Sequence, residues 1–325
     1  MATQLDRKSV ENLIEIIRDL VNEPRRSYRL RRDAARWSQI CSCMDAIGDT
    51  CQATAAYPEV GDSETTGARY LAVYGVLQAL VIQQDAVRDI CEALDKERDV
   101  LGHPRLQEIR DIRVRGAGHP TKQDRPKKKD GKLVPITHHQ TPRVSINSAG
   151  FDLVSASAEE GTTFSSVRIP KLVQDQDRIL SEILREVVVD LRREDEQHRE
   201  RFRQEKLEAI FQGGLGYAFE KVFAHTRPGG EPVLGPVGLS EIRKAVDGFR
   251  LALARRGIEL DTYDSIKYEY EWIEYPLQQL EAYFRGEPNC HIVDPRAAYI
   301  FVAFVQEQMK TLQGIARELD EDYTQ

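Results

Sequence analysis

The chain has 325 residues, of which 41% are hydrophobic and 30% are charged, and its formal net charge is −7. This composition is ordinary for a globular protein and too apolar for wholesale disorder. The longest clean apolar run, residues 297–305, is far shorter than the roughly 20 residues that a membrane helix needs, and the N-terminal segment lacks a signal-peptide pattern. We therefore expect a cytoplasmic protein with no membrane partner.

The five cysteines are odd in number and show no C-x-x-C spacing, which favours reduced, buried thiols. Cys41 and Cys43 lie two positions apart in a predicted helix, so their side chains diverge and do not suit joint metal ligation. We therefore expect no metal site and no other cofactor.

Apolar residues at helical spacing predict three helices in the N-terminal third, over residues 9–22, about 28–56 and about 65–95. The cluster at residues 58–62, which contains Pro58 and Gly61, is expected to end the second of them. The third carries the most apolar run and is expected to be the most buried helix of the bundle.

A fourth helix is predicted to begin at His103 and Pro104, because proline is favoured at the first helical position, and to end at Gly116 and Gly118. Residues 121–170 then alternate apolar and polar side chains in short segments. They predict a small antiparallel sheet inserted among helices, with strands at 132–136, 143–146, 151–155 and 164–169.

A long helix is predicted from about Lys171 to Phe211, and its second half is almost entirely charged. The predicted fold is therefore mainly α. Residues 1–200 form a helical bundle with a β insert at about 121–170, and residues 201–325 form a helical C-terminal domain to which the sequence assigns no role. Helical segments of this second domain are predicted to end near residue 225 and to cover about 239–256, 263–285 and 295–321.

Positive charge is concentrated between Arg105 and Arg143, where eleven Lys and Arg residues face four Asp and Glu residues. A basic segment in an acidic protein suits an anionic partner, and nucleic acid is the first candidate. The alternative interpretation is a solvated loop whose lysines only keep it soluble.

Within this segment, Arg113 precedes His119 by six positions at the predicted end of the fourth helix. Histidine exchanges protons near neutral pH, and the planar fork of arginine suits phosphate oxygens. Similar spacings occur elsewhere, with Arg98 and His103 as the main rival. His119 stands out because it opens directly into the basic segment; the alternative is that it only caps the helix.

The helices of residues 9–120, the ending Arg113-x5-His119-Pro120 and the first half of the 171–211 helix resemble the HEPN superfamily, whose bundles carry an Arg-x(4–6)-His motif. Many members are metal-independent endoribonucleases that act as homodimers. The resemblance implies that His119 is a general acid or base and that Arg113 stabilises charge on the phosphoryl oxygens. It also implies RNA products with 2′,3′-cyclic phosphate ends, and toxin or anti-phage defence roles with an antitoxin or defence-system partner.

Other residues are assigned supporting roles in this interpretation. Arg110, Asp111 and Arg115 are candidates to share the role of the motif arginine, while Lys127, Lys128 and Lys129 are expected to attract the RNA backbone. Because other members of the superfamily are inactive, the alternative function is a non-catalytic helical module that binds RNA or a protein through residues 122–143.

Overall fold

The computed structural model describes residues 9–118, 128–129, 132–133, 137–157, 161–227, 234–288 and 290–323. The fold is mainly α with a small antiparallel sheet, as the sequence predicts. The chain divides into two compact units, Met1–Arg192 and Arg193–Gln325, whereas sequence patterning placed the boundary at about residue 200. None of the helices in the described part of the chain combines the length and apolar character that crossing a bilayer requires.

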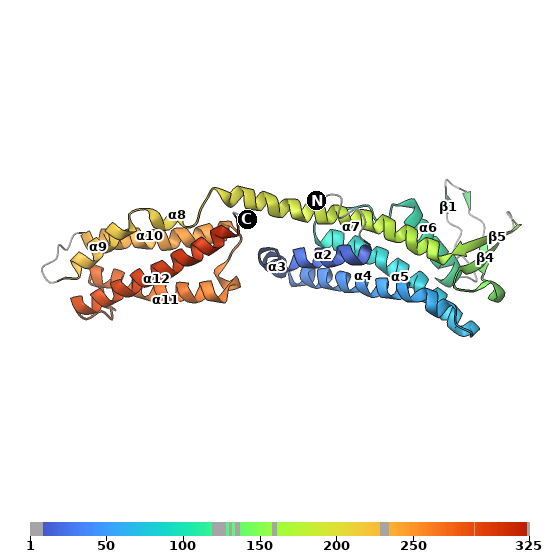
Figure 1. Ribbon diagram of the computed structural model, residues 1–325, viewed down its shortest axis with the longest axis horizontal. Coiled ribbons are helices and arrows are strands. Elements are labelled where there is room, and N and C mark those ends of the chain that lie inside the picture. Colours follow the sequence, from blue (N-terminus) through green and yellow to red (C-terminus); the bar gives the residue numbers. More distant parts are fainter. Residues whose placement is uncertain are drawn as a thin grey trace. The chain divides into compact units, whose positions relative to one another are not determined.

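The first unit is a helical bundle built from amphipathic helices (Figure 1). Helix α2 places all its buried side chains, Val10, Leu13, Ile14, Ile17 and Val21, on one face. In helix α5 twelve residues are buried, and they cover more than half of its circumference, in line with the burial expected from its apolar run. The helices are α2 (Val10–Asn22), α3 (Pro24–Arg31), α4 (Ala34–Gly61), α5 (Thr66–Ala93), α6 (Pro104–Arg113) and the start of α7 (Ile169–Arg203).

Helix boundaries differ from the sequence prediction in three places. The single helix predicted at about 28–56 is wrong: the chain forms α3 and α4 there, with the break at residues 32–33. Helix α4 continues through Pro58 to Gly61 instead of ending at the proline cluster, although Pro58 has no amide hydrogen to donate to the Thr54 carbonyl, and the helix ends one turn after the proline. Helix α7 ends at Arg203 rather than near Phe211, and a separate short helix, α8 (Ala209–Gln212), follows.

The bundle contains a buried amide network. The Gln176 side chain of α7 donates to the Leu80 carbonyl and to Gln83 Oε1, both at 2.9 Å. Its own Oε1 accepts from Gln84 Nε2 at 2.7 Å. Because buried amides are costly when unpaired, these bonds fix how α5 and α7 meet.

A three-stranded antiparallel sheet in the order β3–β4–β5 lies at one end of the bundle (Figure 1). Phe151 of β4 contacts the turn after α6, and the Tyr57 hydroxyl donates to the Asn147 carbonyl at 3.1 Å. The predicted strand at 143–146 is wrong: Arg143–Ser145 is a 3₁₀ turn, closed by the Ser145 amide on the Pro142 carbonyl. The strands are β1 (Lys128–Lys129), β2 (Lys132–Leu133), β3 (Thr137–Gln140), β4 (Gly150–Ser157) and β5 (Gly161–Arg168).

The second unit is helical and has a separate hydrophobic core. Buried aliphatic and aromatic side chains from its long helices form this core, with Phe249 fully enclosed. A buried ion pair between Arg256 and Asp320 joins α10 to the end of α12. The remaining helices are α9 (Leu215–His225), α10 (Leu234–Arg255), α11 (Asp264–Arg285) and α12 (Pro295–Glu321).

Candidate phosphate-binding site at the end of helix α6

Helix α6 begins with a capping interaction made by His103. The Nδ1 atom of His103 accepts a hydrogen bond from the Arg105 amide at 3.2 Å, and Pro104 occupies the first turn. Arg98, the rival motif arginine, instead pairs with Glu186 at 2.9 Å and with Asp190, both on α7. His103 therefore has a local structural role, and the Arg98 guanidinium is occupied by its ion pairs with α7.

Arg110 and Arg113 both face helix α5 but have different partners. The Arg110 guanidinium pairs with the Asp85 carboxylate at 3.0 Å. Arg113 donates through Nε and Nη2 to Gln78 Oε1, at 3.0 and 2.8 Å. Because Gln78 is neutral, this contact orients Arg113 without cancelling its charge, whereas Asp85 compensates that of Arg110.

The segment after α6 is a π-helical turn, η1 (Val114–Gly118). Two glycines permit this wide turn to pack closely. A Cβ atom on Gly116 would lie 3.0 Å from Phe151 Cζ, and one on Gly118 would lie 3.1 Å from Arg113 Nη1. Turns of this kind occur often at functional sites. The turn therefore brings the backbone immediately before His119 against the Arg113 guanidinium.

Several predicted site residues cannot be placed relative to this turn. His119 and Lys127 lie outside the described residues. Lys128 and Lys129 are described only as the backbone of β1, which pairs with β2. Asp111 has an exposed side chain, and its backbone carbonyl accepts from Arg115 Nε at 3.3 Å.

Arg115 lines a pocket of about 390 Å³ formed by residues of α6, the sheet and the start of α7. Cationic side chains dominate its polar lining: Arg105, Arg115, Arg168 and Lys171 face a single lining carboxylate, Glu108. The Ser165 and Ser166 residues of β5 also line it. Their hydroxyls donate to the Leu153 carbonyl at 3.4 Å and to Asp152 Oδ1 at 2.5 Å. The guanidinium donors of the pocket suit the oxygens of a phosphate group.

Part of this positive charge is already compensated. Arg105 pairs with Asp175 at 2.9 Å and with Glu108 at 2.6 Å, while Lys171 pairs with Asp175 at 2.7 Å. The hydrogen bond from Lys171, followed by that from Arg105, lowers the pKa of Asp175 below its ordinary value. Arg115 and Arg168 have no carboxylate partner among the described residues, so they are the cations available to an anionic ligand.

Sequence analysis did not single out His139, which lies close enough to Arg115 for the arginine charge to affect it. His139 is 5% exposed on β3, opposite Ser155, whose hydroxyl lies 2.9 Å from Nδ1. Its buried Nε2 has no hydrogen-bond partner among the described residues. Burial lowers the pKa of His139, and the charges of Arg115 and His138 add to this effect.

Because side chains alternate along a strand, the sequence predicts that His138 and His139 point to opposite faces and do not bind one metal ion together. His138 is exposed and His139 is buried, so the two imidazoles point to opposite faces of β3, as the alternation predicts.

Across the described residues, no group of three or more His, Cys, Asp or Glu side chains could hold a metal ion. The five cysteines are free thiols. Burial raises the pKa of Cys43 and of Cys51 to about 11, and that of Cys91 to about 12, so these groups are protonated near neutral pH.

Comparison with known proteins returns no family model, no curated protein and no solved structure that matches this chain. Functional assignment therefore depends on the geometry of the α6 end.

Proposed function

We propose that the protein is a metal-independent endoribonuclease of HEPN-like type, with its active site at the C-terminal end of α6. One observation carries the proposal: Arg113 is held by the neutral amide of Gln78 and lies against Gly118, the residue before His119. An arginine positioned without a neutralising carboxylate suits a site where negative charge develops.

In this mechanism the ribose 2′-oxygen attacks the adjacent phosphorus, and the bond from phosphorus to the 5′-oxygen breaks. One imidazole accepts the 2′-hydroxyl proton, and an acid donates a proton to the departing 5′-oxygen. We assign these proton transfers to His119 from the two subunits of a homodimer, with Arg113 stabilising the charge on the phosphoryl oxygens. The products are a 2′,3′-cyclic phosphate and a 5′-hydroxyl.

Arg115 and Arg168 extend the proposed site toward the neighbouring pocket. They would hold the RNA backbone on either side of the cleaved bond, together with Lys127 to Lys129. The biological setting, a toxin or anti-phage defence system with an antitoxin or other partner protein in the cytoplasm, belongs to the proposal and rests on the HEPN resemblance alone.

The test is cleavage of mixed cellular RNA by the purified full chain in EDTA, with the product ends identified. His119→Ala is expected to lower the rate by about 10²–10⁴-fold, the usual contribution of a general acid or base. His103→Asn is the matched control, because asparagine retains helix capping. Equal loss in both variants, or cleavage that requires a divalent metal, would contradict the proposal.

The alternative function is a non-catalytic RNA-binding module, which the cationic pocket favours because phosphate binding there does not require His119. Under this alternative, neither wild type nor His119→Ala cleaves RNA, both bind it, and Arg168→Ala weakens binding. Under the nuclease proposal, the wild type cleaves RNA, and His119→Ala cleaves it about 10²–10⁴-fold more slowly but retains RNA affinity.

A further inference from the structure

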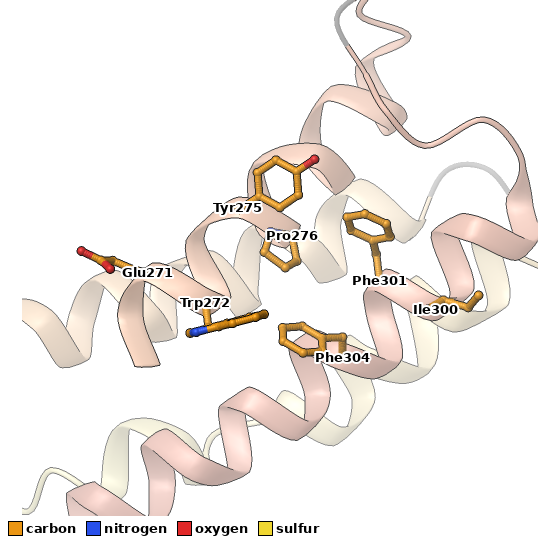
Figure 2. Close-up of a pocket in the computed structure, with 7 residues that line it drawn as sticks. All are labelled: Glu271, Trp272, Tyr275, Pro276, Ile300, Phe301 and Phe304. Atoms are coloured by element: carbon orange, nitrogen blue, oxygen red, sulfur yellow. The ribbon is translucent and has the colours of Figure 1, made fainter. Parts of the chain in front are cut away.

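A groove between α11 and α12 lies in the second unit, outside the proposed nuclease site. Its volume is about 470 Å³, within the range of small-molecule sites. Figure 2 shows its walls: Trp272, Tyr275 and Pro276 come from α11, and Ile300, Phe301 and Phe304 come from α12. The ring centroids of Trp272 and Phe304 are 6.0 Å apart, and those of Tyr275 and Phe301 are 6.4 Å apart.

Among the groove residues, Pro276 is buried and Phe301 packs against the core, whereas Trp272, Tyr275 and Ile300 are exposed. Helix α11 buries a different face, which includes Tyr270 and Ile273. Trp272 and Tyr275 remain 48% and 49% exposed. The Tyr275 hydroxyl is hydrogen-bonded to His291 Nδ1 at 3.0 Å, which fixes the orientation of this ring.

The electrostatics of the groove favour a cation. Aromatic faces carry negative potential and attract cations, with tryptophan the strongest. Glu271 is the single charged residue of the lining, and Figure 2 shows its carboxylate at one end of the groove, directed outward.

The charge of the whole unit acts in the same direction. Residues 193–325 contain 24 Asp and Glu residues and 17 Lys and Arg residues, so their formal charge is −7. This equals the formal net charge of the entire chain. A field of this sign raises the local concentration of cations and disfavours anions.

We propose that the groove between α11 and α12 binds a small organic cation whose ammonium nitrogen carries methyl or longer alkyl groups. The alkyl groups meet the apolar walls, and the positive charge meets the aromatic faces. A bare ammonium group does not fit this lining, because it would lose its hydration without enough hydrogen-bond acceptors in return.

The experiment is isothermal titration calorimetry of the full chain with choline and, separately, with 3,3-dimethylbutan-1-ol, a neutral molecule of the same shape. Choline is expected to bind about tenfold more tightly, because only the cation gains from the aromatic faces. Glu271→Gln should weaken choline binding by about two- to threefold, with the difference vanishing at high salt.

Trp272→Leu, which retains apolar bulk, should abolish most choline binding. Tyr217→Leu is the matched control, because this tyrosine is 63% exposed on α9 and does not line the groove. Circular dichroism of both variants checks that each remains folded.

Equal affinity for choline and its neutral analogue would overturn the proposal, because the groove would then recognise the shape of the ligand and not its positive charge. Absence of saturable choline binding would overturn it as well. Concentration-dependent dimerisation that Trp272→Leu abolishes, without choline binding, would assign the groove to a second copy of the chain.

Discussion

Replacement of Arg256 tests the energetic role of the ion pair in the second unit. Arg256 is 1% exposed, and its Nη1 donates to Asp320 at 2.9 Å. Asp320 also accepts from the backbone amides of Leu207 and Glu208, each at 3.0 Å. The Arg256 guanidinium lies 4.6 Å from the centroid of the Tyr323 ring. The pair thus ties α10, α12 and the segment before α8 together.

The expected cost follows from these contacts. Breaking a buried ion pair by removing one partner usually costs about 3–5 kcal/mol, because the other charge is left without compensation. In Arg256→Met, Asp320 keeps two amide donors, so we expect about 3 kcal/mol. In Asp320→Asn, a guanidinium remains buried without a counter-ion, so we expect about 4 kcal/mol. The double variant should cost less than the sum by about 1–3 kcal/mol.

Urea unfolding followed by tryptophan fluorescence measures these values. The two tryptophans, Trp37 and Trp272, lie in different units, so a Trp37→Phe background makes the signal report on the second unit alone. Losses below about 1 kcal/mol in both single variants, or strict additivity in the double variant, would refute the reasoning that the pair acts as one buried unit.

Three further predictions concern the first unit. Gln176→Leu should lower the unfolding free energy by about 2–4 kcal/mol, because it leaves the buried partners of this amide unpaired; thermal unfolding measures the loss. Gly116→Ala should cost about 1–3 kcal/mol, because its Cβ would lie 3.0 Å from Phe151, whereas Gly48→Ala, with nothing within 4 Å, should be neutral or stabilising in the same assay. His139 has a lowered pKa in the folded state, so protonation favours unfolding, and stability should fall as the pH drops below 6.5. His139→Gln should flatten that part of the pH profile of unfolding, and an unchanged profile would contradict the assignment.

The sequence predicts those parts of the fold that depend on local pattern. The apolar period of residues 65–95 and the His103-Pro104 start of α6 depend on neighbouring residues alone, and the structure reproduces both. The placement of His138 and His139 on opposite faces of a strand also follows from neighbouring residues alone, and β3 reproduces it. The 143–146 segment alternates like a strand, but Pro142 and Ser145 close a local turn instead.

The site depends on tertiary partners that no local pattern encodes. Arg110 and Arg113 are three positions apart, so helical phase places both toward α5, but it does not reveal that one meets a carboxylate and the other an amide. Similarly, Tyr270 and Trp272 belong to one aromatic run, and only the packing of α11 separates the core face from the groove.

Tertiary ion pairs reduce the number of cations in the basic segment that are available to an anionic ligand. Counting residues gives eleven cations between Arg105 and Arg143, but the first unit as a whole contains equal numbers of acidic and basic residues, and ion pairs hold Arg105 and Arg110. At the turn after α6 and in the neighbouring pocket, the described cations without a carboxylate partner are Arg113, Arg115 and Arg168. Single-stranded RNA should therefore bind His119→Ala with a log–log salt slope of about −2, or about −4 if Lys127 to Lys129 also contact the backbone. A slope near −8, as eleven free cations would give, would show that the ion pairs open when RNA binds.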